Sequence, residues 1–205
     1  MLHAAVTVAG DVGAVKAVRW LGGVVTAAKI ASITTTGLAC TKTAPAVLGN
    51  FGADVTVTGG GLKPVLGNLT VAGWLDRATI LSTAGPVGTL TVGGMRDSTI
   101  QVGSVVVADV ANHKTLGGLT VGGITGQAAP FFINSNVSAW TMGTVTLRDV
   151  LTANAGHTPQ AFSVQAHTVA TYSRYAGKAV AKKESKLTGQ APTFDPVGDY
   201  SVQLV

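Results

Sequence analysis

A short motif recurs along this chain and constrains its fold more than any other feature. It reads apolar, Gly, any residue, apolar, Thr, apolar, and four clear copies lie at intervals of 21, 29 and 26 residues. Repeats of about 20 to 50 residues are typical of solenoids, in which each repeat buries its apolar face against its neighbours. The threonines of these copies are Thr70, Thr91, Thr120 and Thr146.

A second apolar element follows the motif, with copies around Ile80, Ile100 and Ile133. Both elements alternate apolar and polar residues, are rich in Val, Ile and Thr, and end at Gly, Asn, Asp or Ser, which favours strands. We therefore expect each coil to contain at least two short strands. The alternation predicts a core made of Leu66, Leu69, Val71, Ile80, Val87, Leu90, Val92, Ile100, Leu116, Leu119, Val121, Ile133 and Val145.

One glycine occupies the same place in each motif. Glycine makes up 27 of the 205 residues, whereas charged residues make up only 11%. Because glycine adopts positive φ without a steric penalty, we expect the glycines of the motif to turn corners in the left-handed conformation. These residues are Gly67, Gly88, Gly117 and Gly143.

Residues 87–94 and 97–100 combine the two elements, and residues 199–204 form a closing Asp-Tyr-Ser-Val-Gln-Leu strand. In these segments the chain resembles the repeat regions of very large bacterial surface and adhesin-like proteins. The likeness covers most of residues 5–165 and the last strand. It implies an all-β fold, a right-handed parallel β-helix or related β-solenoid, in an extracellular structural role. It brings no catalytic residues with it.

The organisation of the sequence changes near residue 166. The pattern predicts solenoid repeats over residues 1–166 and a capping hairpin and strand over residues 167–205. A basic cluster from Arg174 to Lys186 falls in the second part. Lysines protect exposed strand edges from pairing with other chains, so we interpret this part as a short C-terminal antiparallel cap. The alternative is a patch that binds an anionic polymer.

The motifs and apolar runs of the sequence limit which partners we expect. No nucleic-acid-binding motif accompanies the basic cluster, so we expect no nucleic-acid partner. The mean hydropathy is +0.41, but no run supplies the roughly 20 continuous apolar residues of a membrane helix. We therefore expect no transmembrane segment. The expected partner is a polysaccharide or another cell-surface polymer.

The N-terminal end shows neither a signal-peptide pattern nor a cap. Solenoids need capped ends, and nothing before Ala5 resembles one. Two interpretations follow: a cytoplasmic protein, or the C-terminal part of a longer extracellular or cell-surface protein that continues upstream repeats. The missing cap favours the second. The single Cys40 rules out an internal disulfide and leaves the compartment open.

Three carboxylates are the candidates for catalysis. Aligning the turns after two motifs places Asp76 and Asp97 one coil apart, at about the 4.8 Å spacing of adjacent strands. Carboxyl groups about 5–5.5 Å apart serve retaining glycosidases, so a polysaccharide-cleaving β-helix is one alternative. Asp109 lies in a break of the repeat beside a histidine and a lysine. The competing interpretation is local turn capping, in which aspartate is favoured.

The repeated threonines are candidates for binding. Together with Thr7 and Thr34, we expect Thr70, Thr91, Thr120 and Thr146 to form one outward column, with a partial second column interrupted at Asn68 and Gly118. Regular threonine arrays on flat β-solenoids resemble ice-binding faces, which gives a further alternative. The simpler interpretation is that threonine suits outward strand positions and pairs with its copies.

The remaining reactive residue types do not form a recognisable site. The four histidines, His3, His113, His157 and His167, share no repeat position, and no His-x-His or Cys-x-x-Cys spacing occurs. We expect no metal and no cofactor. The sequence thus favours a non-catalytic structural or adhesive segment over the enzyme and ice-binding alternatives.

Overall fold

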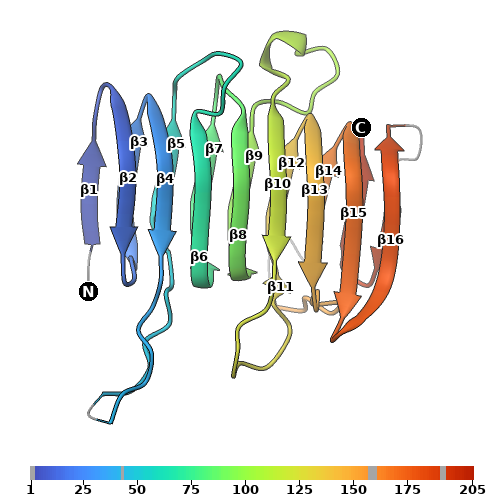
Figure 1. The fold of residues 1–205 in the computed structure, drawn as a ribbon. Coiled ribbons are helices and arrows are strands. Elements are labelled where there is room, and N and C mark those ends of the chain that lie inside the picture. The colour runs from blue at the N-terminus through green and yellow to red at the C-terminus, as the bar shows by residue number, and fades with distance from the viewer. Residues whose placement is uncertain (1–2, 43, 157–160, 190–192) are drawn as a thin grey trace.

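The computed structural model describes residues 3–42, 44–156, 161–189 and 193–205, which form two β-sheets lying face to face (Figure 1). Strands alternate between the sheets along most of the chain. The back sheet in Figure 1 has the order β1 (His3–Thr7), β3 (Gly22–Ala27), β5 (Asp54–Val57), β7 (Thr79–Ser82), β9 (Thr99–Val102), β12 (Asn136–Ala139), β14 (Phe162–Ala166), β18 (Tyr200–Leu204) and β17 (Phe194–Val197).

The front sheet contains the longer strands. Its order is β16 (Ala179–Thr188), β15 (Thr168–Ala176), β13 (Thr141–Arg148), β10 (Thr115–Val121), β8 (Val87–Arg96), β6 (Leu66–Asp76), β4 (Lys29–Thr35) and β2 (Asp11–Ala17). The short β11 (Phe132–Ile133) pairs with β8, and a 3₁₀-helix, η1 (Val110–Asn112), lies in the loop before β10.

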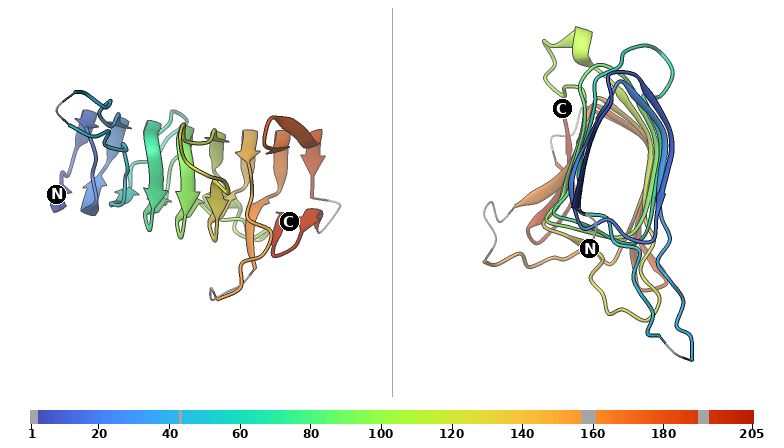
Figure 2. Two further views of the ribbon diagram at one scale, coloured as in Figure 1. Left: turned by 90° about the horizontal axis from the view of Figure 1, so that it is seen from below. Right: turned by 90° about the vertical axis from the view of Figure 1, so that its left-hand side faces the viewer.

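Neighbouring strands pair in parallel from β1 to β14 in the back sheet and from β2 to β15 in the front sheet. Seen along the stacking direction, successive passes of the chain superimpose into one rectangular outline from which loops project (Figure 2). The predicted all-β class and the parallel pairing of most of its strands are therefore confirmed.

The core lies between the sheets, where the alternation predicted it. All of the predicted core positions except Ile133 expose at most 1% of their surface. Ile133 is partly buried and packs against the core. Since strand side chains point alternately to opposite faces, the residues between these positions face outward.

The glycines of the motif stack in a column, and the prediction of positive φ for them is wrong. A Cβ atom on Gly88 would collide with the carbonyl oxygen of Gly67 in the preceding strand, and one on Gly143 would collide with that of Gly117. Glycine is required because the backbones approach closely at this point, which leaves no room for a side chain.

Antiparallel pairing occurs at the C-terminal end, in the segment where the sequence predicted antiparallel strands. β16 pairs with β15 through a turn at Gly177 (φ 61°), and β17 pairs with β18. β15 and β18 lie beyond residue 166 and still extend the parallel sheets.

A buried polar cluster ties this cap to the core. The Tyr172 hydroxyl donates to Oδ2 of Asp195 at 2.7 Å and lies 3.0 Å from the Tyr200 hydroxyl. Arg174 donates to both oxygens of the same carboxylate, at 2.7 and 2.8 Å. These contacts join β15, β17 and β18, because each strand contributes at least one member.

Candidate functional site

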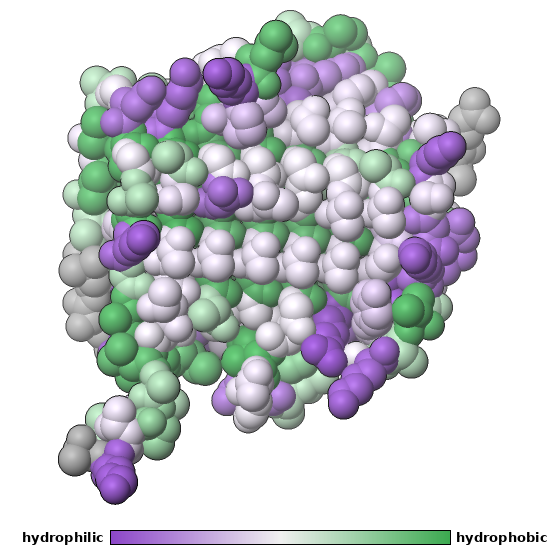
Figure 3. Space-filling model, in the orientation of Figure 1, coloured by the Kyte–Doolittle hydropathy of each residue, from purple (hydrophilic) through white to green (hydrophobic). Residues whose placement is uncertain are grey.

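Five threonines form an unbroken row on the outer face of the front sheet. Each is the register partner of the next on β4, β6, β8, β10 and β13. None of the five is buried, and Figure 3 shows near-neutral rows of side chains crossing this face of the molecule. We call this row the threonine ladder: Thr34, Thr70, Thr91, Thr120 and Thr146.

One detail of the ladder differs from the sequence prediction, and the second column agrees with it. Thr7 does not belong to it, because β1 lies in the back sheet and pairs Thr7 with Thr26. The parallel second column contains Asn68, which accepts a hydrogen bond from the Thr89 hydroxyl at 3.0 Å. Gly118 interrupts that column, since it is the register partner of Thr89.

Asp76 lies at the end of β6, opposite Arg96 rather than opposite Asp97 as the sequence alignment placed it. The Arg96 guanidinium donates to both carboxylate oxygens, at 2.9 and 2.8 Å. Arg77 lies 3.5 Å from the same carboxylate. The hydrogen bonds from Arg96 are the largest cause that lowers the pKa of Asp76, and the charges of Arg96 and Arg77 lower it further. Burial acts in the opposite direction and raises it.

Asp97 occupies the turn that follows β8. Its φ of 49° falls in the left-handed region, as does that of Asn134 (φ 41°). Its carboxylate accepts a hydrogen bond from Nδ2 of Asn134 at 2.7 Å. Asp and Asn tolerate this conformation better than most residues, so a turn at this position favours them.

Asp109 lies at the opposite end of the coil from the other two aspartates. It precedes η1, which stands above the sheets in Figure 1, whereas β6 and β8 end at the bottom. Its carboxylate accepts a hydrogen bond from Nδ2 of Asn112 at 2.9 Å. The structure thus pairs Asp76 with Arg96, holds Asp97 against Asn134, and keeps Asp109 apart from both.

A stack of three rings was not anticipated from the sequence. His113 and Trp140 stack with centroids 3.4 Å apart, and His167 stacks on Trp140 at 4.2 Å. Trp140 and His167 both immediately precede a front-sheet strand, at Thr141 and Thr168, and this shared position was the available signal. His157 lies outside the described residues.

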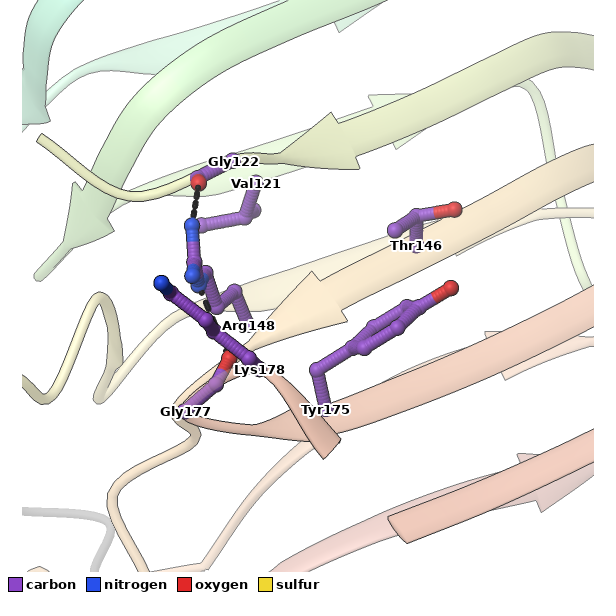
Figure 4. A pocket seen from close by; sticks show the side chains of 7 residues that line it. All are labelled: Val121, Gly122, Thr146, Arg148, Tyr175, Gly177 and Lys178. Atoms are coloured by element: carbon purple, nitrogen blue, oxygen red, sulfur yellow. Dashed lines mark hydrogen bonds between the residues drawn. The ribbon is translucent and has the colours of Figure 1, made fainter. Parts of the chain in front are cut away.

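A groove of about 300 Å³ opens at the lower end of the front sheet, next to the last threonine of the ladder. It is lined by Thr146, Arg148, Tyr175 and Lys178, among others, from β13, β15 and the turn between β15 and β16 (Figure 4). The repeat motif gave no sign of it, because Arg148, Tyr175 and Lys178 lie outside the copies of the motif.

Within the part of the chain that the structure describes, no group of three or more His, Cys, Asp or Glu residues is arranged to hold a metal ion. No helix among the described residues is long and apolar enough to cross a membrane. Comparisons with protein-family models, with curated proteins and with solved structures found no match to this chain.

Proposed function

We propose that this chain is a non-catalytic structural or adhesive segment of a bacterial surface or secreted protein, built as a right-handed parallel β-helix. The observation that carries the proposal is the parallel pairing of neighbouring strands from β1 to β18 in one sheet and from β2 to β15 in the other, around one core. Each pass of the chain packs its apolar residues against the neighbouring passes, which builds a stable body with strands exposed along its outer faces.

The direction of the strands supports the right-handed winding. In Figure 1 the front strands run downward from β2 to β15 while β1 in the back sheet runs upward, and the chain advances from left to right. A chain that descends at the front, ascends at the back and advances to the right winds in the right-handed sense.

Mechanical unfolding of the purified chain tests the structural role. Because each coil contacts only its neighbours, the stacked coils are expected to unfold one after another, each step at a measurable force. Leu90→Ala is expected to lower that force, since it removes a side chain that is 0% exposed. Thr91→Ala, on the outer face of the same strand, is the matched control. Gradual extension at low force would contradict a load-bearing role.

A screen for turnover tests the non-catalytic part of the proposal. Acidic and neutral polysaccharides are incubated with the chain, and new reducing ends or unsaturated products are measured. We expect none. Turnover that is lost in Asp76→Asn, Asp97→Asn or Asp109→Asn would replace this proposal with a polysaccharide-cleaving β-helix.

The threonine ladder favours a second candidate, ice binding. Five threonines in register on neighbouring parallel strands repeat at about 4.8 Å, the strand spacing, and present hydroxyl and methyl groups on one sheet face. Thermal hysteresis is the test. Thr91→Tyr is expected to abolish it, and Gln101→Tyr on the back sheet is the matched control. No hysteresis in the unaltered chain would dismiss this candidate.

A further inference from the structure

We infer that the groove beside the end of the threonine ladder binds an acidic sugar residue of a polysaccharide, through Arg148, Lys178 and Tyr175. The inference rests on the proposed adhesive role and names its class of partner. A volume of about 300 Å³ is at the small end of ligand sites, which span about 300 to 1,000 Å³. It suits one sugar ring.

Positive charge is fixed at one side of the groove. Arg148 donates from Nε to the Gly177 carbonyl at 3.1 Å and from Nη1 to the Gly122 carbonyl at 2.9 Å. Asp149 lies 3.8 Å from Nε and accepts a hydrogen bond from the Gly177 amide at 2.5 Å. Among the described residues no ion pair involves Lys178. Two cations beside one carboxylate leave a net positive charge for an anionic group.

The other side of the groove offers an aromatic ring and hydroxyl groups. Figure 4 shows the hydroxyls of Tyr175 and Thr146 pointing away from the nitrogen atoms of Arg148 and Lys178. A tyrosine ring combines an apolar face with a polar tip, which matches the apolar face and hydroxyl rim of a sugar. An acidic sugar engages both sides at once, with its anionic group toward the cations.

Two neighbouring depressions extend the groove and favour a polymer over a single sugar. One of about 270 Å³ shares Arg148 with the groove, and one of about 380 Å³ shares Tyr175 with it. Asp149 lines both depressions. The three hollows follow the ends of β10, β13 and β15, so successive sugar units have adjacent places to lie.

Calorimetric titration of the full chain tests this inference, with polygalacturonate, dextran sulfate, neutral dextran and polyglutamate as probes. We expect one or both anionic polysaccharides to bind and the other two polymers to bind at least about tenfold more weakly. Lys178→Gln and Tyr175→Leu are each expected to weaken binding about tenfold or more. Lys183→Gln removes the same charge from an exposed position of β16 outside the groove, and is expected to change affinity less than about twofold.

Equal weakening by Lys178→Gln and Lys183→Gln would overturn the inference, because it would indicate diffuse charge attraction. Equal binding of polyglutamate would also overturn it, since no sugar would be recognised. Binding of none of the probes would overturn the groove assignment while the mechanical result still stands. Shortening of a bound polysaccharide would support the groove and contradict the non-catalytic role. Comparing polygalacturonate with dextran sulfate identifies carboxylate or sulfate as the recognised anion, and either result supports the inference.

Discussion

The Asp76 carboxylate, 16% exposed, is held by two hydrogen bonds from Arg96, and its pKa is lowered mainly by them. The lowered pKa means that the folded state binds this proton less tightly than the unfolded state. The stability it contributes is therefore present above the ordinary value of 3.8 and is lost as the pH falls through the lower, folded value.

Asp76→Asn is expected to lower the free energy of unfolding at pH 7 and to flatten the loss of stability below about pH 4. Denaturant titrations at a series of pH values measure both effects. Arg96→Gln removes the partner and should reproduce the lowered stability at pH 7. An acid slope in Asp76→Asn as steep as in the unaltered chain would refute the assignment.

At Gly88 the backbone lies so close to the preceding strand that no side chain fits. Gly88→Ala is expected to cost about 1–3 kcal/mol, because the new methyl group meets the Gly67 carbonyl oxygen and the strand must shift. Gly13→Ala is the matched control. Gly13 has the equivalent position in β2, where a Cβ meets nothing within 4 Å. Thermal or denaturant unfolding of both variants distinguishes this from a general effect of replacing glycine.

Individual strands divide their residues between core and surface. Leu90 is 0% exposed within β8, and Thr91 faces outward. Leu90→Ala is expected to cost about 2–5 kcal/mol through lost burial and a cavity. Thr91→Ala is expected to change the free energy of unfolding by about 0.5 kcal/mol or less. Similar losses in the two variants, measured by denaturant unfolding, would mean that the alternation does not control stability.

The C-terminal strands β15 and β18 are expected to lose stability at high pH because they bury Tyr172 and Tyr200. Burial, with the Asp195 charge, raises the pKa of Tyr172 and Tyr200 above the ordinary value of 10. A raised pKa contributes stability below the unfolded value and loses it as the pH rises toward the folded value. The chain is therefore expected to lose stability above about pH 10, and Tyr200→Phe to lose less. Denaturant midpoints between pH 8 and pH 11 test this, and equal alkaline slopes would contradict it.

At the scale of the whole molecule, the stacked sheets have one edge protected by charge. β16 is an edge strand with exposed Lys183 and Lys186. Lysines on an edge oppose pairing with the edge of another molecule.

Lys183→Thr with Lys186→Asn is expected to cause self-association, measured as larger species by light scattering at equal concentration. Asparagine suits position 186 because its φ is 57°. Lys42→Thr with Lys63→Asn removes the same charge from exposed loop positions and is expected to leave the chain unassociated. Equal association of the two double variants would show that net charge, and not the edge, is responsible.

The alternation in the sequence was sufficient to predict the strands, the core and the outward threonines, because side-chain direction in a strand repeats every two residues. Leu69 and Thr70 therefore lie on the predicted faces. Such local patterns depend only on neighbouring residues. The Gly177 hairpin belongs to the same class, since its turn is encoded within a few residues.

Only the tertiary structure decided which residues on neighbouring passes of the chain contact each other. The register between β6 and β8 shifts between Val71 and Trp74, so Asp76 faces Arg96 and not Asp97. Coils of unequal length make such shifts invisible to a repeat alignment. The groove depends on Arg148 and Lys178, which come together because β13 and β15 are neighbours in the sheet. The predicted repeats end at residue 166, whereas β15 continues the parallel stacking beyond it, so the repeat pattern did not place Lys178 near Arg148.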